Sequence, residues 1–291
     1  MEGEHTKRIP TELEIEVLQH IADEDEHDSS RWRALVNCAL VCKAWTGHVR
    51  SHLYYAINMN TFRGFLQFGR LHEYNHLQPF LREFTWPRRI YRFDGSDTCT
   101  IKGIAPTVTK LRFRGVDYQS LDPPLKDAMS TFTNIKELDM TGSIFENWTT
   151  VVRVVSSFPL LAILVMPCTS NFQDDNLDGP EISYPLPSRL VHIKLASGCE
   201  TETVSWIRKG SPIPDIQTVE AESVIDSNVL AKLLRSLGGG LRHLIIHIDS
   251  TRAFLISSLA LSKLISIGHH SWRGYLRSIS ILLSPYREYR P

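Results

Sequence analysis

The sequence predicts an α/β fold in which a small N-terminal helical module precedes a larger domain with one strand per repeat. Three observations lead to this prediction. Two short amphipathic helices precede residue 50, an apolar pattern then recurs about every 27 residues, and most intervening segments have helical periodicity. Because such repeats stack side by side, we expect a curved solenoid with a parallel sheet, and we divide the chain into residues 1–53 and 54–291.

The composition restricts the classes of function. Of the 291 residues 42% are hydrophobic and 22% are charged, as in soluble globular proteins. The 32 basic and 32 acidic residues cancel, so nothing favours nucleic acid or a membrane surface, and a protein partner is expected. The chain starts without an apolar leader, and its apolar runs are too short to span a bilayer. We therefore expect an intracellular protein, cytoplasmic or nuclear, with reduced cysteines and no cofactor.

The first helix is predicted to begin at Pro10, where the missing N–H costs no hydrogen bond. Its apolar face consists of Leu13, Val17, Leu18 and Ile21. An acidic run at residues 23–28 is predicted to be a solvated loop.

The second helix is predicted to start after Ser30 and to run to about Gly47. Its apolar stripe contains Leu35, Cys38, Ala39, Cys42 and Trp45, and a third apolar segment follows at residues 49–57. Two short helices cannot bury both of their apolar faces against each other, so part of this surface is available to a partner.

This pair of helices resembles the F-box, whose pattern runs Leu-Pro-x-Glu-Leu, an apolar helix, then Leu-Val-Cys-x-x-Trp. The first half matches Ile9-Pro10-Thr11-Glu12-Leu13, with Ile9 in place of leucine, and the second half matches Val41-Cys42-Lys43-Ala44-Trp45. The match covers about the first fifth of the chain. F-boxes dock on a Skp-type adaptor, and the resemblance implies that the adaptor is bound by Ile9, Pro10, Leu13, Val17, Leu18, Val41, Cys42 and Trp45.

The repeat template is apolar-x-x-apolar-x-apolar. It starts at Tyr54, Leu81, Val108, Ile135, Leu161, Leu190, Ile216, Leu241 and Leu276. Successive starts are about 25 to 29 residues apart, except for the longer last interval. This spacing resembles that of leucine-rich repeats, although no repeat has their regular Asn or Cys ladder, so the repeats are divergent. The alternative is an ordinary α/β sheet domain with coincidental spacing.

The segments between the templates are of two kinds. Amphipathic helices are predicted within residues 61–74, 121–132, 148–158, 201–208 and 226–237. Residues 88–106 and 170–187 are rich in Gly, Pro and Asp, which predicts extended loops. Residues 252–267 are predicted to hold one long helix or two short ones.

The residues between the template positions are predicted to face outward from the sheet. Charges on neighbouring strands alternate in sign there, so they can pair with each other. Ile163 and Val165 are apolar at these positions, and we predict that they bind a protein client together with Arg112 and Arg114. In the competing account, the loop at residues 170–187 folds over the two apolar residues.

One string matches a catalytic motif, namely the H-E-x-x-H of zinc proteases at His72, Glu73 and His76. On a helix the two histidines would face one way and could hold zinc, yet Arg70 precedes the motif and Pro79 follows it within a turn. No metzincin-type Gly or third His follows at the expected spacing, which leaves only a distant Glu as a third ligand. We expect no metal and no catalytic residue.

The two resemblances together imply the substrate-recognition subunit of an SCF-type cullin-RING ubiquitin ligase. Such a subunit binds a Skp-type adaptor, and through it a cullin, with its F-box, and holds a protein client with its repeats. It performs no chemistry itself. The alternatives are a zinc metalloprotease that uses His72, Glu73 and His76, and a non-ligase repeat scaffold whose N-terminal helices only cap the array.

Overall fold

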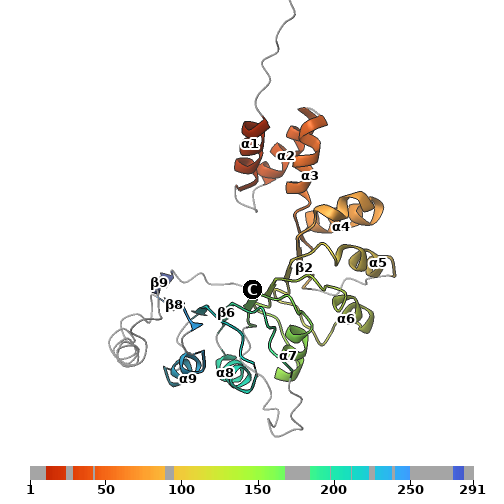
Figure 1. The fold of residues 1–291 in the computed structure, drawn as a ribbon. Helices are drawn as coiled ribbons and strands as arrows, with labels where there is room; N and C mark the ends of the chain where they lie inside the picture. Colours follow the sequence, from red (N-terminus) through yellow and green to blue (C-terminus); the bar gives the residue numbers. More distant parts are fainter. Residues whose placement is uncertain are drawn as a thin grey trace, which may run out of the picture.

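A computed structural model of the chain describes residues 11–23, 29–41, 43–88, 95–167, 184–196, 198–210, 212–222, 227–237, 240–249 and 278–284. It is an α/β structure in which strands line the inner side of an arc and helices α4 to α9 lie on its outer side (Figure 1). Three helices, α1 to α3, sit at one end of this arc. None of the helices in the described ranges is long and apolar enough to cross a membrane.

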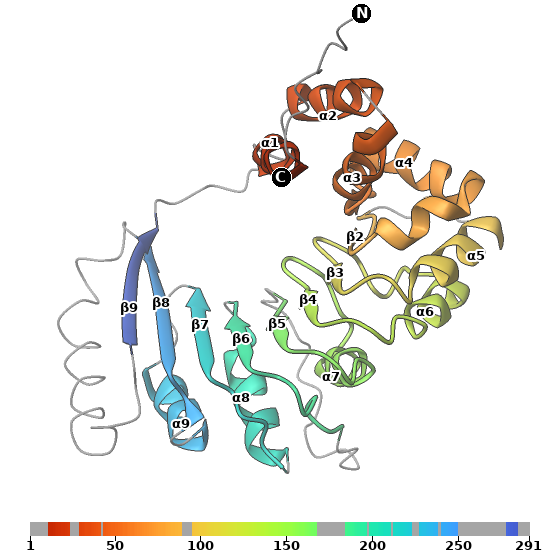
Figure 2. The same ribbon diagram turned by 45° about the horizontal axis from the view of Figure 1, so that its top comes forward.

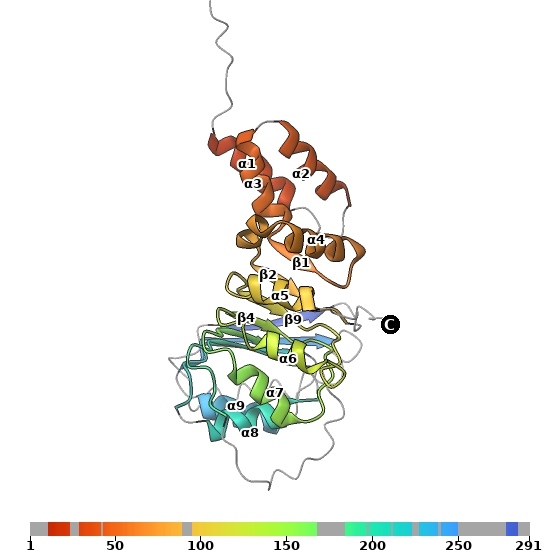
Figure 3. The same cartoon turned by 90° about the vertical axis from the view of Figure 1, so that its right-hand side faces the viewer.

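The N-terminal helices are α1 (Thr11–Asp23), α2 (Ser29–Val41) and α3 (Lys43–Leu53). Among the described side chains, Leu18, Leu35 and Val49, one from each helix, are at most 1% exposed and belong to one cluster. Figure 3 shows the three helices grouped beyond the first strands of the sheet.

The prediction of one helix running to about Gly47 is wrong, because α2 ends at Val41 and α3 begins at Lys43. The core explains the break. On one straight helix Leu35 and Val49 would lie about 21 Å apart, at 1.5 Å per residue, and could not both join the cluster around Leu18. Thr46 Oγ1 donates to the Ala39 carbonyl (3.3 Å) across the junction.

The sheet has nine strands among the described residues, all parallel and in chain order (Figure 2). They are β1 (Ala56–Asn58), β2 (Glu83–Thr85), β3 (Lys110–Arg112), β4 (Glu137–Asp139), β5 (Ile163–Val165), β6 (His192–Leu195), β7 (Thr218–Glu222), β8 (His243–Asp249) and β9 (Ser278–Ser284). The middle template residues stay in register, since Ile57 pairs with Phe84 and Phe84 with Leu111. One parallel strand per repeat is therefore confirmed.

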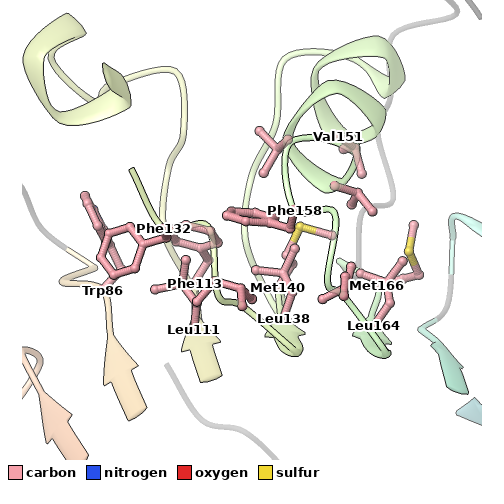
Figure 4. Packing of buried hydrophobic residues seen from close by; sticks show 14 of the residues in the cluster. Trp86, Leu111, Phe113, Phe132, Leu138, Met140, Val151, Phe158, Leu164 and Met166 are labelled. Carbon is pink, nitrogen blue, oxygen red and sulfur yellow. The ribbon is translucent and has the colours of Figure 1, made fainter. Parts of the chain in front are cut away.

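The template residues form the main core. In every repeat that starts between Tyr54 and Ile216, all three of them are at most 8% exposed. Phe84 lies at the centre of an aromatic group, with ring centroids 5.8 Å from Trp86, 6.0 Å from Phe68 and 6.4 Å from Phe132. Figure 4 shows this core continuing along the sheet through the labelled residues Phe113, Leu138, Met140, Phe158, Leu164 and Met166.

Helices form where the apolar periodicity predicts them. They are α4 (Phe62–Glu73), α6 (Pro123–Met129), α7 (Trp148–Ser156), α8 (Glu200–Lys209) and α9 (Ser227–Leu237). Side-chain caps begin two of them, because Thr61 Oγ1 accepts from Gly64 N (3.0 Å) and Asn147 Oδ1 accepts from Thr150 N (2.8 Å). A 3-10 helix, η1 (Asn75–Phe80), follows α4.

The predicted extended loop at residues 88–106 is wrong in its second half, where α5 (Gly95–Ile104) forms. Ile101 and Ile104 are completely buried in the main core, and this burial outweighs the low helix propensity of the glycines. Gly103 also lies against the Gln78 side chain, where a Cβ atom would come within 2.9 Å of Oε1. The predicted loop at 170–187 falls almost wholly outside the described residues, as does the helical segment at 252–267.

The same type of turn follows the strand in two successive repeats. Gly115 and Gly142 both have φ of 68°, a left-handed conformation that favours glycine. The two turns are hydrogen-bonded to each other, because Gly115 N donates to the Thr141 carbonyl (3.1 Å). The local geometry thus recurs with the sequence period.

Candidate functional site

The N-terminal helices leave large apolar side chains on their surface. On α1, Leu13 is 50% and Val17 is 48% exposed, and they lie one turn apart on the same helix face. On α2, Leu40 is 80% and Val41 is 67% exposed. Exposed apolar side chains of this kind are typical of a surface that a partner covers.

The predicted adaptor residues fall into three groups. Leu13 and Val17 are exposed on α1, and Val41 is exposed at the end of α2. Leu18 is 1% exposed, so it belongs to the core of the module and is not available to a partner in this structure. Trp45 is half-buried and packs against the same core.

Ile9, Pro10 and Cys42 lie outside the described residues. Sequence reasoning did not select Leu40, the most exposed of these apolar side chains. Its place at the leucine of the Leu-Val-Cys-x-x-Trp pattern, directly before Val41, was the available signal.

The surface is held in a defined position relative to the sheet. The Arg63 guanidinium of α4 lies 5.1 Å from the centroid of the Trp32 ring on α2. Gln67, which is 7% exposed, donates from Nε2 to the Leu53 carbonyl at the end of α3 (2.7 Å). Leu53 itself packs against both hydrophobic cores. A partner on α1 and α2 would therefore be fixed relative to the arc.

The face of the sheet opposite the main core carries two rows of side chains, one from each outward position of the strands. By strand register from β1 to β8 the first row is Ala56, Glu83, Lys110, Glu137, Ile163, His192, Thr218 and His243, and the second is Asn58, Thr85, Arg112, Asp139, Val165, Lys194, Glu220 and Ile245. The predicted client residues Arg112, Ile163 and Val165 are in these rows, and Arg114 lies just beyond the end of β3.

Ion pairs connect β2, β3 and β4 within these rows. Lys110 Nζ lies 2.6 Å from Glu137 Oε1 and 3.8 Å from Glu83 Oε2. Arg112 Nη2 lies 3.1 Å from Glu83 Oε1, and the Glu83 side chain is only 9% exposed. Arg112 therefore pairs with the nearly buried carboxylate of Glu83. Pairing between neighbouring strands was one of two roles that the sequence predicted for the charged positions, and client binding was the other.

Asp139 accepts hydrogen bonds from Arg114 and Thr141. Arg114 Nε donates to Oδ2 (2.7 Å), while Thr141 donates to Oδ1 from N (3.0 Å) and Oγ1 (2.7 Å). Burial alone raises the pKa of Asp139, but these hydrogen bonds and the Arg114 charge outweigh it and leave the pKa below its ordinary value. Asp139 is therefore ionised at neutral pH and is bound to Arg114.

A second charged group lies on β6 and β7. Lys194 Nζ is 2.7 Å from Glu220 Oε1, and His192 Nε2 is 3.6 Å from Glu220 Oε2. Between this group and the first lies β5, whose Ile163 and Val165 are half-buried. On this face of the sheet, the apolar side chains of β5 thus lie between two sets of paired charges.

The zinc-protease string does not form the helix that its chemistry requires. His72 and Glu73 end α4, whereas His76 lies in η1 beyond the cap residue Tyr74. The four-residue spacing of the two histidines therefore does not place them on one α-helical face. In the described ranges, no group of three or more His, Cys, Asp or Glu side chains is arranged to hold a metal ion.

Thiol reactivity offers a direct test of the burial described here. Cys199 is completely buried, and burial is the main cause that raises the pKa of its thiol to about 12. At pH 8 only about one Cys199 in 10⁴ is then a thiolate, the form that reacts. We expect iodoacetamide to label the exposed Cys99 at least about 100 times faster, as followed by peptide mass spectrometry. Similar labelling rates in the folded protein would contradict this burial.

Comparison of the chain with protein-family models gives no match, and comparison with curated proteins gives none either. Three features of the chain itself therefore bear on its function. They are a parallel sheet in chain order, a helical module with exposed apolar side chains, and a sheet face on which an apolar strand lies between paired charges.

Proposed function

We propose that this chain is the substrate-recognition subunit of an SCF-type cullin-RING ubiquitin ligase. In this proposal residues 1–53 form an F-box-like module that binds a Skp-type adaptor, and through it a cullin. Residues 54–291 form a divergent leucine-rich-repeat-like solenoid that holds a protein client. The chain itself performs no chemistry and acts inside the cell, where ubiquitin ligases work.

One observation carries the proposal. Leu13, Val17 and Val41, which match the F-box pattern, are also among the most exposed large apolar residues of the N-terminal helices. Keeping such side chains in water is unfavourable, and a partner that covers them gains about 25 cal/mol for each Å² of apolar surface buried. The coincidence of motif and exposure favours an adaptor surface over helices that only cap the array.

The solenoid part of the proposal has separate support. The strands follow one another in chain order, one for each recurrence of the template. The same glycine turn occurs at Gly115 and Gly142. Stacking of similar units in sequence order is the property that defines repeat arrays.

The adaptor surface is tested by placing charges on it. Leu13→Asp/Val17→Asp is expected to abolish pull-down of a purified Skp-type adaptor by the full chain, because truncating each central apolar anchor typically costs about 2 kcal/mol or more. Both side chains are about half exposed, so the helices should keep their circular dichroism spectrum. The matched control is Ile15→Asp, which changes a 43% exposed residue on the other side of α1 and should leave the adaptor bound.

Three outcomes would oppose the proposal. Undiminished adaptor binding by the double variant would show that Leu13 and Val17 do not bind the adaptor. A wild-type chain that binds no Skp-type adaptor would favour the non-ligase scaffold. About one zinc per chain by elemental analysis, lost on His72→Ala, would favour the metalloprotease.

A further inference from the structure

The rows of paired charges on the sheet face are interrupted at β5. Ile163 lies between Glu137 and His192 in one row, and Val165 lies between Asp139 and Lys194 in the other. Neighbouring strands are about 4.8 Å apart, so residues on β4 and β6 are separated by about 9.6 Å. The ion pairs described above join β2, β3 and β4 to one another or β6 to β7, and none of them joins β4 to β6.

Each acidic or lysine side chain beside β5 is instead engaged on the side away from it. Glu137 pairs with Lys110 at 2.6 Å, and Asp139 pairs with Arg114 at 2.7 Å. On the other side Lys194 pairs with Glu220 at 2.7 Å. The charges that border β5 are thus already compensated within the chain.

Because these charges are compensated, β5 favours an apolar group of a partner over a charged one. A charged group of a partner would compete with one of these pairs, and unpairing a side chain as buried as Asp139, which is 4% exposed, is costly. An apolar side chain placed on Ile163 and Val165 removes apolar surface from water and breaks no pair.

The backbone of β5 cannot take up a partner strand. Ile163 N donates to the Lys136 carbonyl (2.9 Å) on the β4 side, and His192 N donates to the Ala162 carbonyl (3.0 Å) on the β6 side. With both edges of the strand in use, recognition must occur through side chains, not by adding a strand to the sheet.

We infer that this surface binds an uncharged protein segment through one or two large aliphatic or aromatic side chains that cover Ile163 and Val165. The inference rests on the proposed function, in which the segment belongs to the client. Arg112 and Arg114, predicted from sequence to bind the client, pair with Glu83 and Asp139 within the chain. In this inference they neutralise those carboxylates, and Ile163 and Val165 make the contact with the client.

A library of random peptides displayed on phage, selected on the full chain, tests this inference. The selected peptides are expected to share large apolar residues without a common charge. Their affinity should change less than about twofold between about 0.1 and 1 M salt, over which the Debye length falls from about 10 to about 3 Å. Ile163→Asn/Val165→Asn should weaken binding at least about tenfold, the effect of about 1.4 kcal/mol.

Two variants serve as controls. Ile163→Ala/Val165→Ala removes apolar area without adding polar groups and should weaken the same peptides. Arg112→Gln should leave their affinity within about twofold, because Arg112 is engaged with Glu83. All variants should still bind the adaptor, so a wild-type chain that fails to bind an adaptor refutes the proposed function independently of the peptide result.

Other results would overturn the inference. These are selection of acidic peptides whose binding falls with salt and with Arg112→Gln, binding that survives both double variants, and a selection that yields no peptide dependent on Ile163 and Val165. A concentration-dependent dimer that the double variants abolish would assign the surface to a second copy of the chain.

Discussion

Replacing Phe84 by alanine is expected to lower the free energy of unfolding by about 3 to 5 kcal/mol, the range for removing a buried aromatic side chain. Phe84 is completely buried, and its ring contacts those of Phe68, Trp86 and Phe132. Phe68 belongs to α4, Trp86 directly follows β2, and Phe132 lies in the segment after α6. The cavity would therefore loosen several repeats at once.

The matched control is Phe65→Ala, the same chemical change on the outer face of α4. Phe65 is 50% exposed, so its removal should cost less than about 1 kcal/mol. Urea unfolding followed by circular dichroism and tryptophan fluorescence measures both variants. A Phe84→Ala chain within about 1 kcal/mol of the wild type would contradict the packing described here.

The strands were predictable because two periods coincide in the sequence. Alternation within a strand sends Leu111 inward and Lys110 and Arg112 outward, and the repeat places the same pattern beside it at Leu138. A slip of one residue would turn Leu138 outward and Glu137 into the core, at a large cost in free energy. The register was therefore fixed by the sequence alone.

Local patterns failed where distant contacts decide the structure. Helix α5 contains Gly95 and Gly103, and it is stabilised by burial of Ile101 and Ile104 in a core assembled from other repeats. The sequence pattern also does not predict the break between α2 and α3, because the apolar stripe continues at helical spacing from Cys38 to Trp45. Both features depend on tertiary packing, which a periodic pattern does not encode.

The site was predictable in position more than in role. The helical pattern placed Val17 and Leu18 on one apolar face, yet Val17 is 48% exposed and Leu18 is 1% exposed. Adjacent residues differ by 100° around a helix, and only the packing of α2 and α3 decides which of them is covered. Similarly, the sequence placed Arg112 on the sheet face but did not decide whether it pairs with Glu83 or remains available.

Replacing Asp139 by alanine is expected to lower the free energy of unfolding by about 1 to 3 kcal/mol at pH 7, because three hydrogen bonds to a buried carboxylate are lost. The residues affected are Thr141, whose N and Oγ1 both donate to Asp139, and Arg114. The control Asp127→Ala changes an exposed aspartate on α6 and should stay within about 0.5 kcal/mol of the wild type.

The effect of Asp139→Ala should depend on pH in a defined direction. The pKa of Asp139 is lowered in the folded state, so its carboxylate stabilises the fold fully above the unfolded pKa of about 3.9, and this contribution is lost as pH falls through the folded pKa. The difference between wild type and Asp139→Ala should be constant above about pH 5 and should shrink below about pH 4. Urea unfolding at a series of pH values measures it. A difference that stays unchanged down to about pH 2 would mean that the ionised carboxylate is not the source of the stabilisation, and that the Arg114 pair contributes nothing beyond neutral hydrogen bonds.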